Sequence, residues 1–196
     1  MKRPGVLLAV FVVALLGFIT LNSVSSKGPG SKGLPADAPL PPFAMPLSTS
    51  SCRGACDANV ATGADQGSAG ARPACSVRGP HVLNSCALAE RGPFVLAFVF
   101  VPVRRCRDQV ATLARAQARH PEVRFAVVAV RADAAKARSL GRALPVGYDH
   151  DGAVANEYGV VVCPTITYVA RGGRVVGSTV GPQGDAAIES WVRRIA

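Results

Sequence analysis

Hydrophobic and polar positions follow several different patterns along the chain, and the first is an unbroken apolar run. From Gly5 to Leu21 nearly every residue is apolar, and no charged side chain occurs between Pro4 and Ser26. A helix needs about 20 apolar residues to cross a bilayer, whereas a helix packed on a domain would show a polar face. The run therefore predicts a signal anchor, a transmembrane helix within residues 1–26.

Charged residues on either side of this run indicate how it would be oriented in a membrane. Lys2 and Arg3 precede it and favour a cytoplasmic N-terminus, which would place the rest of a single-pass protein outside the cell membrane. Lys27 and Lys32 on the other flank weaken that charge argument. The alternative is a cleaved signal peptide followed by secretion, because small residues at 23–26 would permit cleavage.

Two polar stretches separate the apolar run from the remainder. Residues 27–42 are rich in Gly, Pro, Ser and Lys and predict a tether that its prolines partly stiffen. Residues 43–92 predict a loop-rich extension, because positions 48–74 contain almost no large apolar side chain. We expect cysteines, rather than a hydrophobic core, to hold this extension together.

From residue 93 to 196 buried and amphipathic segments alternate. Residues 94–101 are apolar at every position, as in a strand that is buried on both faces. Residues 104–119 repeat apolar positions at helical spacing, and Pro121 marks the end of that helix. The further elements expected are strands at 123–130, 145–148, 165–169 and 174–180 and helices at 132–143, 152–158 and 185–195.

This order of elements predicts an α/β fold. Strand–helix–strand units imply parallel pairing with right-handed crossovers, and Gly172-Gly173 indicates a hairpin between the last two strands. A mixed central sheet flanked by helices follows.

The charge of the chain and its cysteine content indicate the kind of partner and the cellular compartment. The net charge is +10 over 196 residues, and its tightest cluster is Arg104, Arg105 and Arg107. No aromatic residues or nucleic-acid motif accompany that cluster, so acidic partners or an anionic membrane surface fit it better than nucleic acid. Six cysteines are typical of an oxidising, extracytoplasmic compartment.

Residues 145–181 contain several short motifs, and the order in which they occur indicates a protein family more specifically than any single motif does. In order they are Asp149-x-x-Gly152, Tyr158-Gly-Val160, Pro164-Thr165, the Gly-Gly hairpin and a glycine after the last strand. In this order they resemble the second half of a TlpA/ResA-type redoxin, and the resemblance covers about residues 35–196, loosely before residue 93.

The resemblance implies a thioredoxin-like fold and thiol–disulfide chemistry without a cofactor or metal. Partners would be secreted or membrane proteins or peptides that carry thiols or disulfides. Pro164 would be a cis-proline whose loop presents its backbone to a bound peptide.

The redox motif of that family is incomplete here. The family places Cys-x-x-Cys where the first central strand meets its helix, but Val103 stands at the first position and Cys106 at the second. Valine forms no thiolate, so ordinary exchange through this motif is excluded. The resemblance places Cys163 near Cys106, which makes these two our candidate redox pair. The candidate substrate-binding residues are Pro164, Val103, Arg104 and Arg105.

Two other functions remain open. A non-catalytic thioredoxin-fold module would bind a partner along the Pro164 loop, with Cys106 buried or locked in a structural disulfide. A peroxiredoxin-like antioxidant protein is less favoured, because it needs a Thr or Ser where Val103 stands.

The remaining cysteines precede the first central strand. Cys52, Cys56, Cys75 and Cys86 allow three pairings, of which Cys52–Cys56 with Cys75–Cys86 is simplest because each bond closes a short loop. A zinc site is the alternative, although structural zinc usually has two closely spaced cysteine pairs. We predict structural disulfides that stabilise the extension.

Overall fold

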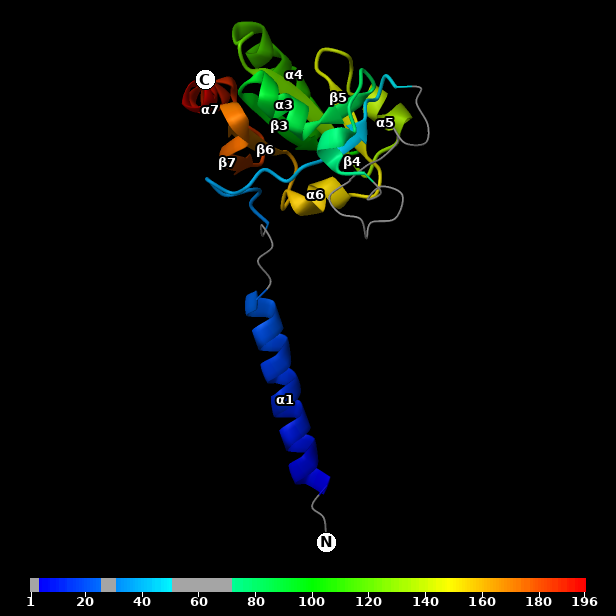
Figure 1. Ribbon diagram of the computed structural model, residues 1–196, viewed down its shortest axis with the longest axis vertical. Helices are drawn as coiled ribbons and strands as arrows, with labels where there is room; N and C mark the ends of the chain where they lie inside the picture. The colour runs from blue at the N-terminus through cyan, green and yellow to red at the C-terminus, as the bar shows by residue number, and fades with distance from the viewer. Residues whose placement is uncertain (1–3, 26–30, 51–71) are drawn as a thin grey trace.

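A computed structural model describes residues 4–25, 31–50 and 72–196 (Figure 1). Helix α1 (Pro4–Ser25) stands apart from the folded part of the molecule. Across the described residues, no helix has both the length and the apolar character that crossing a membrane requires. The transmembrane helix expected within residues 1–26 is therefore not found, and membrane attachment stays a prediction.

The described part of the folded region is built on a five-stranded mixed sheet with the order β5-β4-β3-β6-β7. Strands β3, β4 and β5 are parallel, whereas β6 runs antiparallel to β3 and β7 antiparallel to β6. The mixed sheet expected from the order of elements is thereby confirmed. The strands are β3 (Phe94–Val99), β4 (Arg124–Val130), β5 (Val146–Asp149), β6 (Thr165–Ala170) and β7 (Arg174–Val180).

Strand β3 lies in the middle of this sheet, and all of its residues are buried. Alternate side chains of a strand point to opposite faces, and here they enter two separate cores. Val95, Ala97 and Val99 pack with α4 (Arg104–Arg119) and α7 (Asp185–Ile195). Phe94, Leu96 and Phe98 pack on the other face with α6 (Ala153–Glu157) and α3 (Ser85–Arg91). Apolar residues at every position of β3 are the consequence of this double burial.

The extension is more ordered than the sequence pattern suggests. Strand β1 (Ala44–Pro46) pairs antiparallel with β2 (Val82–Asn84), and η2 (Ala74–Ser76) is a short 3₁₀ helix between them. Phe43 and Met45 are fully buried in the core that α6 covers. The described part of the extension is therefore a portion of the domain core, which it shares with the main sheet.

Most elements in residues 93–196 begin and end within two residues of their expected limits. The exception is α5 (Ala134–Arg138), which is shorter than the expected 132–143. Asp133 caps its start by accepting a hydrogen bond from the amide of Lys136 at 2.8 Å. A turn that includes Gly141 at φ +93° follows its end, so the helix stops early.

The Asp-x-x-Gly motif has a structural explanation. The buried carboxylate of Asp149, at the end of β5, accepts hydrogen bonds from the amides of Gly152 at 3.1 Å and Ala155 at 2.8 Å. Gly152 adopts φ +84°, where a side chain would be strained. This carboxylate ties the sheet to the first turn of α6.

Candidate redox site

Cys106 and Cys163 form a disulfide at the carboxyl end of β3, with their Cα atoms 5.8 Å apart. Cys106 lies in the first turn of α4, and Cys163 precedes β6. The peptide bond between Cys163 and Pro164 is cis, as the resemblance implied. The structure thus brings both candidate redox residues and the cis-proline loop to one place.

Val103 lies immediately before α4 and is partly exposed. Its carbonyl accepts hydrogen bonds from the amides of Cys106 at 3.0 Å and Arg107 at 3.2 Å. Its side chain offers no acceptor, so the helix lacks the side-chain cap that Ser, Thr or Asp would supply. The positive end of the α4 dipole lies next to the disulfide, and the residue before the helix offers no side chain to neutralise it.

The cis-proline loop is fixed by three hydrogen bonds. The hydroxyl of Thr165 donates to the carbonyl of Val162 at 2.6 Å, which closes the turn around Cys163. The amide of Gly181 donates to the carbonyl of Pro164 at 2.8 Å. The amide of Phe100 donates to Sγ of Cys163 at 3.1 Å. The loop is thereby tied to the ends of both β7 and β3.

Exposed apolar side chains occur in this loop and in the segments next to it. Outside α1, the exposed large hydrophobic residues in the described part of the chain are four valines, Val103, Val161, Val162 and Val180, which we call the valine rim. Val103 precedes α4, Val161 and Val162 precede Cys163, and Val180 is the register partner of Thr165. Exposed apolar groups that gather in one place are typical of an interaction surface.

The arginine cluster lies beside the valine rim. Arg104, Arg105 and Arg107 are all exposed in the first turn of α4. Arg104 approaches Asp108 at 3.9 Å, whereas Arg105 and Arg107 form no ion pair with any residue that the structure describes. Positive charge is therefore available near the disulfide.

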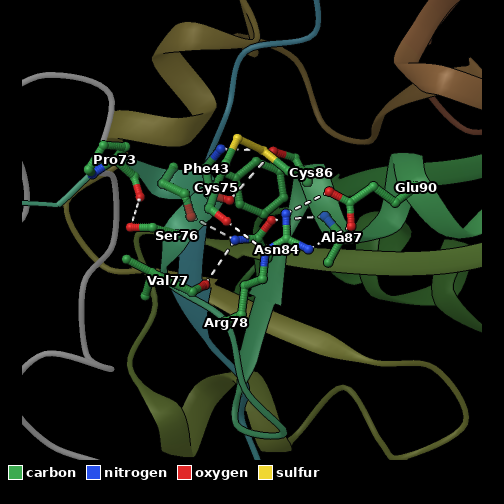
Figure 2. Close-up of a disulfide and its surroundings, with 12 residues drawn as sticks. Phe43, Pro73, Cys75, Ser76, Val77, Arg78, Asn84, Cys86, Ala87 and Glu90 are labelled. Atoms are coloured by element: carbon green, nitrogen blue, oxygen red, sulfur yellow. Dashed lines mark hydrogen bonds and ion pairs between the residues drawn. A yellow bond between two sulfur atoms is a disulfide. The ribbon is translucent and has the colours of Figure 1, made fainter.

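A second disulfide joins Cys75 to Cys86 within the extension (Figure 2). It confirms the pairing expected for these two cysteines, whose sulfurs are therefore not zinc ligands. Cys52 and Cys56 lie outside the described residues, and within the residues described no group of His, Cys, Asp or Glu could hold a metal ion.

Polar side chains reinforce this disulfide. The amide group of Asn84 donates to the carbonyls of Ala74 at 2.7 Å and Val77 at 2.9 Å, and Arg78 forms two 2.6 Å hydrogen bonds with Glu90. Figure 2 shows Asn84 at the centre of these contacts.

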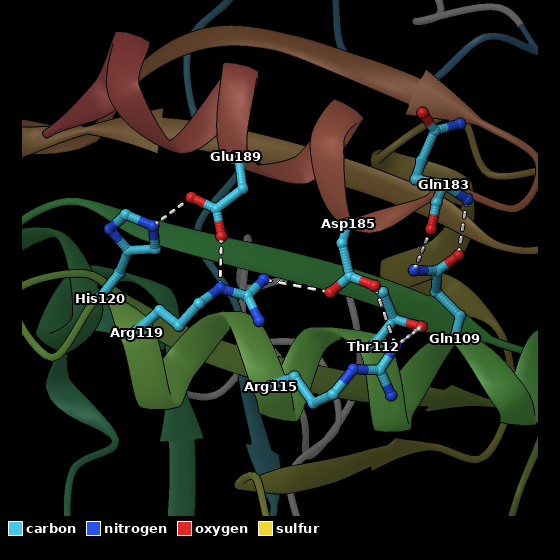
Figure 3. A network of polar contacts seen from close by, with 8 residues as sticks. All are labelled: Gln109, Thr112, Arg115, Arg119, His120, Gln183, Asp185 and Glu189. Atoms are coloured by element: carbon cyan, nitrogen blue, oxygen red, sulfur yellow. Dashed lines mark hydrogen bonds and ion pairs between the residues drawn. The ribbon is translucent and has the colours of Figure 1, made fainter.

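A polar network holds α4 against α7 (Figure 3). Glu189 binds both Arg119, at 2.6 Å, and His120. The hydrogen bond with Glu189 is the main cause that raises the pKa of His120, and the same bond, followed by that with Arg119, lowers the pKa of Glu189. These contacts fix the position of the helix that carries Cys106.

Two contacts that support the site could not be recognised from any pattern in the sequence. The side-chain amide of Gln109 forms two hydrogen bonds with the backbone of Gln183. It donates to the carbonyl at 3.0 Å and accepts from the N–H at 2.7 Å. The amide of Phe100 is a backbone group that every residue except proline possesses. Neither could be recognised without the tertiary arrangement.

Solved structures share this fold. A putative thiol:disulfide interchange protein DsbE from Chlorobium tepidum is 18% identical, with a TM-score of 0.60 over 85% of this chain and 98% of that chain. A putative protein disulfide isomerase from Bacteroides thetaiotaomicron is 15% identical, with a TM-score of 0.61 over 84% and 91%. MTB dsbF, in mixed oxidised and reduced forms, is 22% identical, with a TM-score of 0.55 over 59% and 89%.

At these identities the similarity shows the thioredoxin-like fold alone. The sequence matches no family model and no curated protein.

Proposed function

We propose that this chain is a thiol–disulfide oxidoreductase that exchanges with protein thiols through Cys106 and Cys163. The observation that carries the proposal is the disulfide between these residues, formed beside the cis-proline loop and in the first turn of α4. This is the place where the resemblance to TlpA/ResA-type redoxins puts the redox site. The pair joins two separate elements, in place of a Cys-x-x-Cys motif within one helix.

The surroundings of the pair suit exchange with a protein. A helix N-terminus and nearby arginines stabilise a thiolate, and Arg105 and Arg107 supply such charge. The valine rim would accept apolar side chains, and the arginine cluster would attract acidic ones. The substrates proposed are therefore secreted or membrane proteins whose reactive cysteine lies in an apolar, acidic segment.

The proposed setting is the extracytoplasmic side of the cell membrane. The apolar sequence of residues 5–21 supports an N-terminal anchor, and secretion after cleavage is the alternative. The Cys75–Cys86 disulfide supports an oxidising compartment, because such bonds rarely persist in the cytosol.

A non-catalytic binding module is the second candidate. The complete burial of Cys106 and the loss of a nucleophile at Val103 favour it. In that case the Cys106–Cys163 bond would be structural, and the valine rim would bind a partner without exchange. The peroxiredoxin alternative has less support, because Val103 offers no hydroxyl to the sulfur.

Redox titration of the full chain separates these candidates. The protein is equilibrated in glutathione buffers of graded potential, its thiols are alkylated, and each cysteine is mapped by mass spectrometry. We expect Cys106–Cys163 to be reduced at a higher potential than Cys75–Cys86, and the chain to oxidise a reduced model protein. The matched control replaces Cys75 and Cys86 by serine and should retain exchange. Equal resistance of both bonds, without turnover, would favour the binding module.

A further inference from the structure

We infer that Cys163 is the sulfur that bonds to the substrate, and that Cys106 is the buried sulfur that leaves and later re-forms the pair. This assignment rests on the proposed function and deepens it. It gives Cys163, which precedes the cis-proline, the role that the cysteine at position 103 would have had.

The two cysteines differ in how deeply they are buried. Cys106 is 0% exposed and packs in the core with Val110 and Leu113. Cys163 belongs to the same core but keeps 8% of its surface exposed, and it follows Val161 and Val162, which are 66% and 41% exposed. A thiolate must reach the sulfur that it attacks. A substrate sulfur that approaches over the exposed valines meets Cys163 first, and it reaches Cys106 only if α4 moves.

The position of Cys106 suits a leaving group. It is the third residue of a 16-residue helix, and Val103 provides no side-chain cap for the first-turn amides. The helix dipole favours negative charge there, and in an exchange the sulfur that is not attacked is the one that leaves. The disulfide therefore breaks with the electron pair on Cys106.

The amide of Phe100 holds the other sulfur. It donates to Sγ of Cys163 at 3.1 Å in the oxidised protein. The same donor can stabilise a Cys163 thiolate when that residue is released, because hydrogen bonds to a charged acceptor are stronger. Cys163 thus stays at the end of β3 while its covalent partner changes.

The reaction balances without another reactant. A substrate thiolate attacks Sγ of Cys163, the bond to Cys106 breaks, and Cys106 departs as a thiolate. The second substrate thiol loses its proton and attacks the substrate sulfur that is bound to Cys163, which leaves as a thiolate. The substrate dithiol becomes a disulfide and gives up two electrons and two protons. The Cys106–Cys163 pair takes up the electrons, and the protons pass to its two thiolates or to solvent. The reverse order reduces a substrate disulfide.

Single variants of the full chain test the assignment. Cys106→Ser and Cys163→Ser are each treated with oxidised glutathione, and adducts are mapped by mass spectrometry. We expect Cys163 in the first variant to form the mixed disulfide at least about tenfold faster than Cys106 in the second, because Cys163 is the less buried of the two and lies next to the exposed valines. Faster reaction of Cys106 would overturn the assignment and leave the proposed exchange intact.

The wild-type protein provides a measurement that does not depend on the folding of variants. The oxidised chain is treated briefly with reduced glutathione, quenched with acid and alkylated. Glutathione on Cys163 with an alkyl group on Cys106 supports the assignment, and the opposite distribution overturns it. If neither residue is modified and the bond stays intact, both the assignment and the proposed exchange fail.

Discussion

The amide of Phe100 and the sulfur of Cys163 are hydrogen-bonded at 3.1 Å, although the two residues are 63 positions apart in the chain. Through this contact the last turn before α4 touches the cis-proline loop at the reactive atom. The contact makes the Phe100 amide a reporter of the charge on Cys163, since a thiolate is a stronger acceptor than a disulfide sulfur.

Reduction should therefore move the amide resonance of Phe100. We expect a downfield proton shift on reduction, because a thiolate accepts the hydrogen bond of this amide more strongly than a disulfide sulfur does. Two-dimensional NMR of the oxidised and reduced chain measures it. The amide of Ala87, which donates to Asn84 near the other disulfide, is the control. An unchanged Phe100 resonance would contradict the contact.

Replacing Val103 by serine should raise the stability of the fold and lower the rate of thiol–disulfide exchange. A serine at this position can accept a hydrogen bond from the first turn of α4, so Val103→Ser should stabilise the fold by about 1 kcal/mol. The same cap offsets part of the helix dipole that favours negative charge on Cys106, so exchange should become slower. Denaturant unfolding and the rate of reaction with glutathione measure the two effects.

Val103→Ala is the matched control for this substitution, because it removes the apolar group without adding an acceptor. A serine variant that is no more stable than the alanine variant would show that the start of α4 needs no cap.

Changing Val161 should affect protein substrates selectively. Val161→Ser removes an exposed apolar group that packs on little else, so stability should change by less than about 0.5 kcal/mol. Exchange with a cysteine peptide that carries leucine and glutamate neighbours should slow, whereas exchange with glutathione should not. An equal effect on both reagents would indicate that the valine rim does not bind the substrate.

Removal of the Asp149 carboxylate should weaken the junction between β5 and α6. Asp149→Ala leaves the buried amide of Ala155 without this acceptor, and it should cost about 1–3 kcal/mol in the free energy of unfolding. Urea denaturation measures it, with an unchanged slope expected. Asp151→Ala, which removes an exposed acceptor of the same turn, should cost less. Equal costs would argue against the role assigned to Asp149.

The stability of the α4–α7 contact should depend on pH in two directions. The pKa of His120 is raised from 6.5, mainly by Glu189, so the stabilisation from its protonated form is complete below 6.5 and is lost as pH rises through the higher folded pKa. The pKa of Glu189 is lowered from 4.5 by His120 and then Arg119, so its contribution is present above 4.5 and is lost as pH falls through the lower folded pKa.

The difference in Tm between wild type and Glu189→Gln should therefore be greatest from about pH 4.5 to 6.5. It should shrink on either side, and part should persist at high pH because Arg119 remains charged. Thermal melts at several pH values measure it, and Glu122→Gln, which removes a weaker partner of His120, is the control. A difference that does not vary with pH would contradict this coupling.

The sequence predicts the fold best where burial is most regular. Residues 94–99 are apolar throughout because helices cover both faces of β3, and 104–119 show the helical spacing of a helix with one buried face. Strands β1 and β2 cannot be predicted from the pattern, because three residues are too few to establish a period. Phe43 and Met45 likewise look isolated in the sequence, and only the tertiary arrangement places them in the core.

The candidate site was predictable only in part. The cysteines and Pro164 could be placed through the order of motifs around them, since each motif is a turn with a local requirement. The Phe100 amide and the contacts between Gln109 and Gln183 could not, because they depend on which segments meet in space. Of the valine rim the sequence indicates Val103 alone as a binding residue, because the rim's members come from three separate segments.

The burial of Phe43 and Met45 limits how far the chain can be shortened from its N-terminus and still fold. A recombinant fragment that starts at residue 93 would keep every strand of the main sheet, yet it would expose the face on which these side chains pack. Full burial of two such residues contributes about 3–6 kcal/mol, a large share of the 5–15 kcal/mol that typically stabilises a domain. The smallest fragment that folds on its own should therefore begin before Phe43 and retain the Cys75–Cys86 bond.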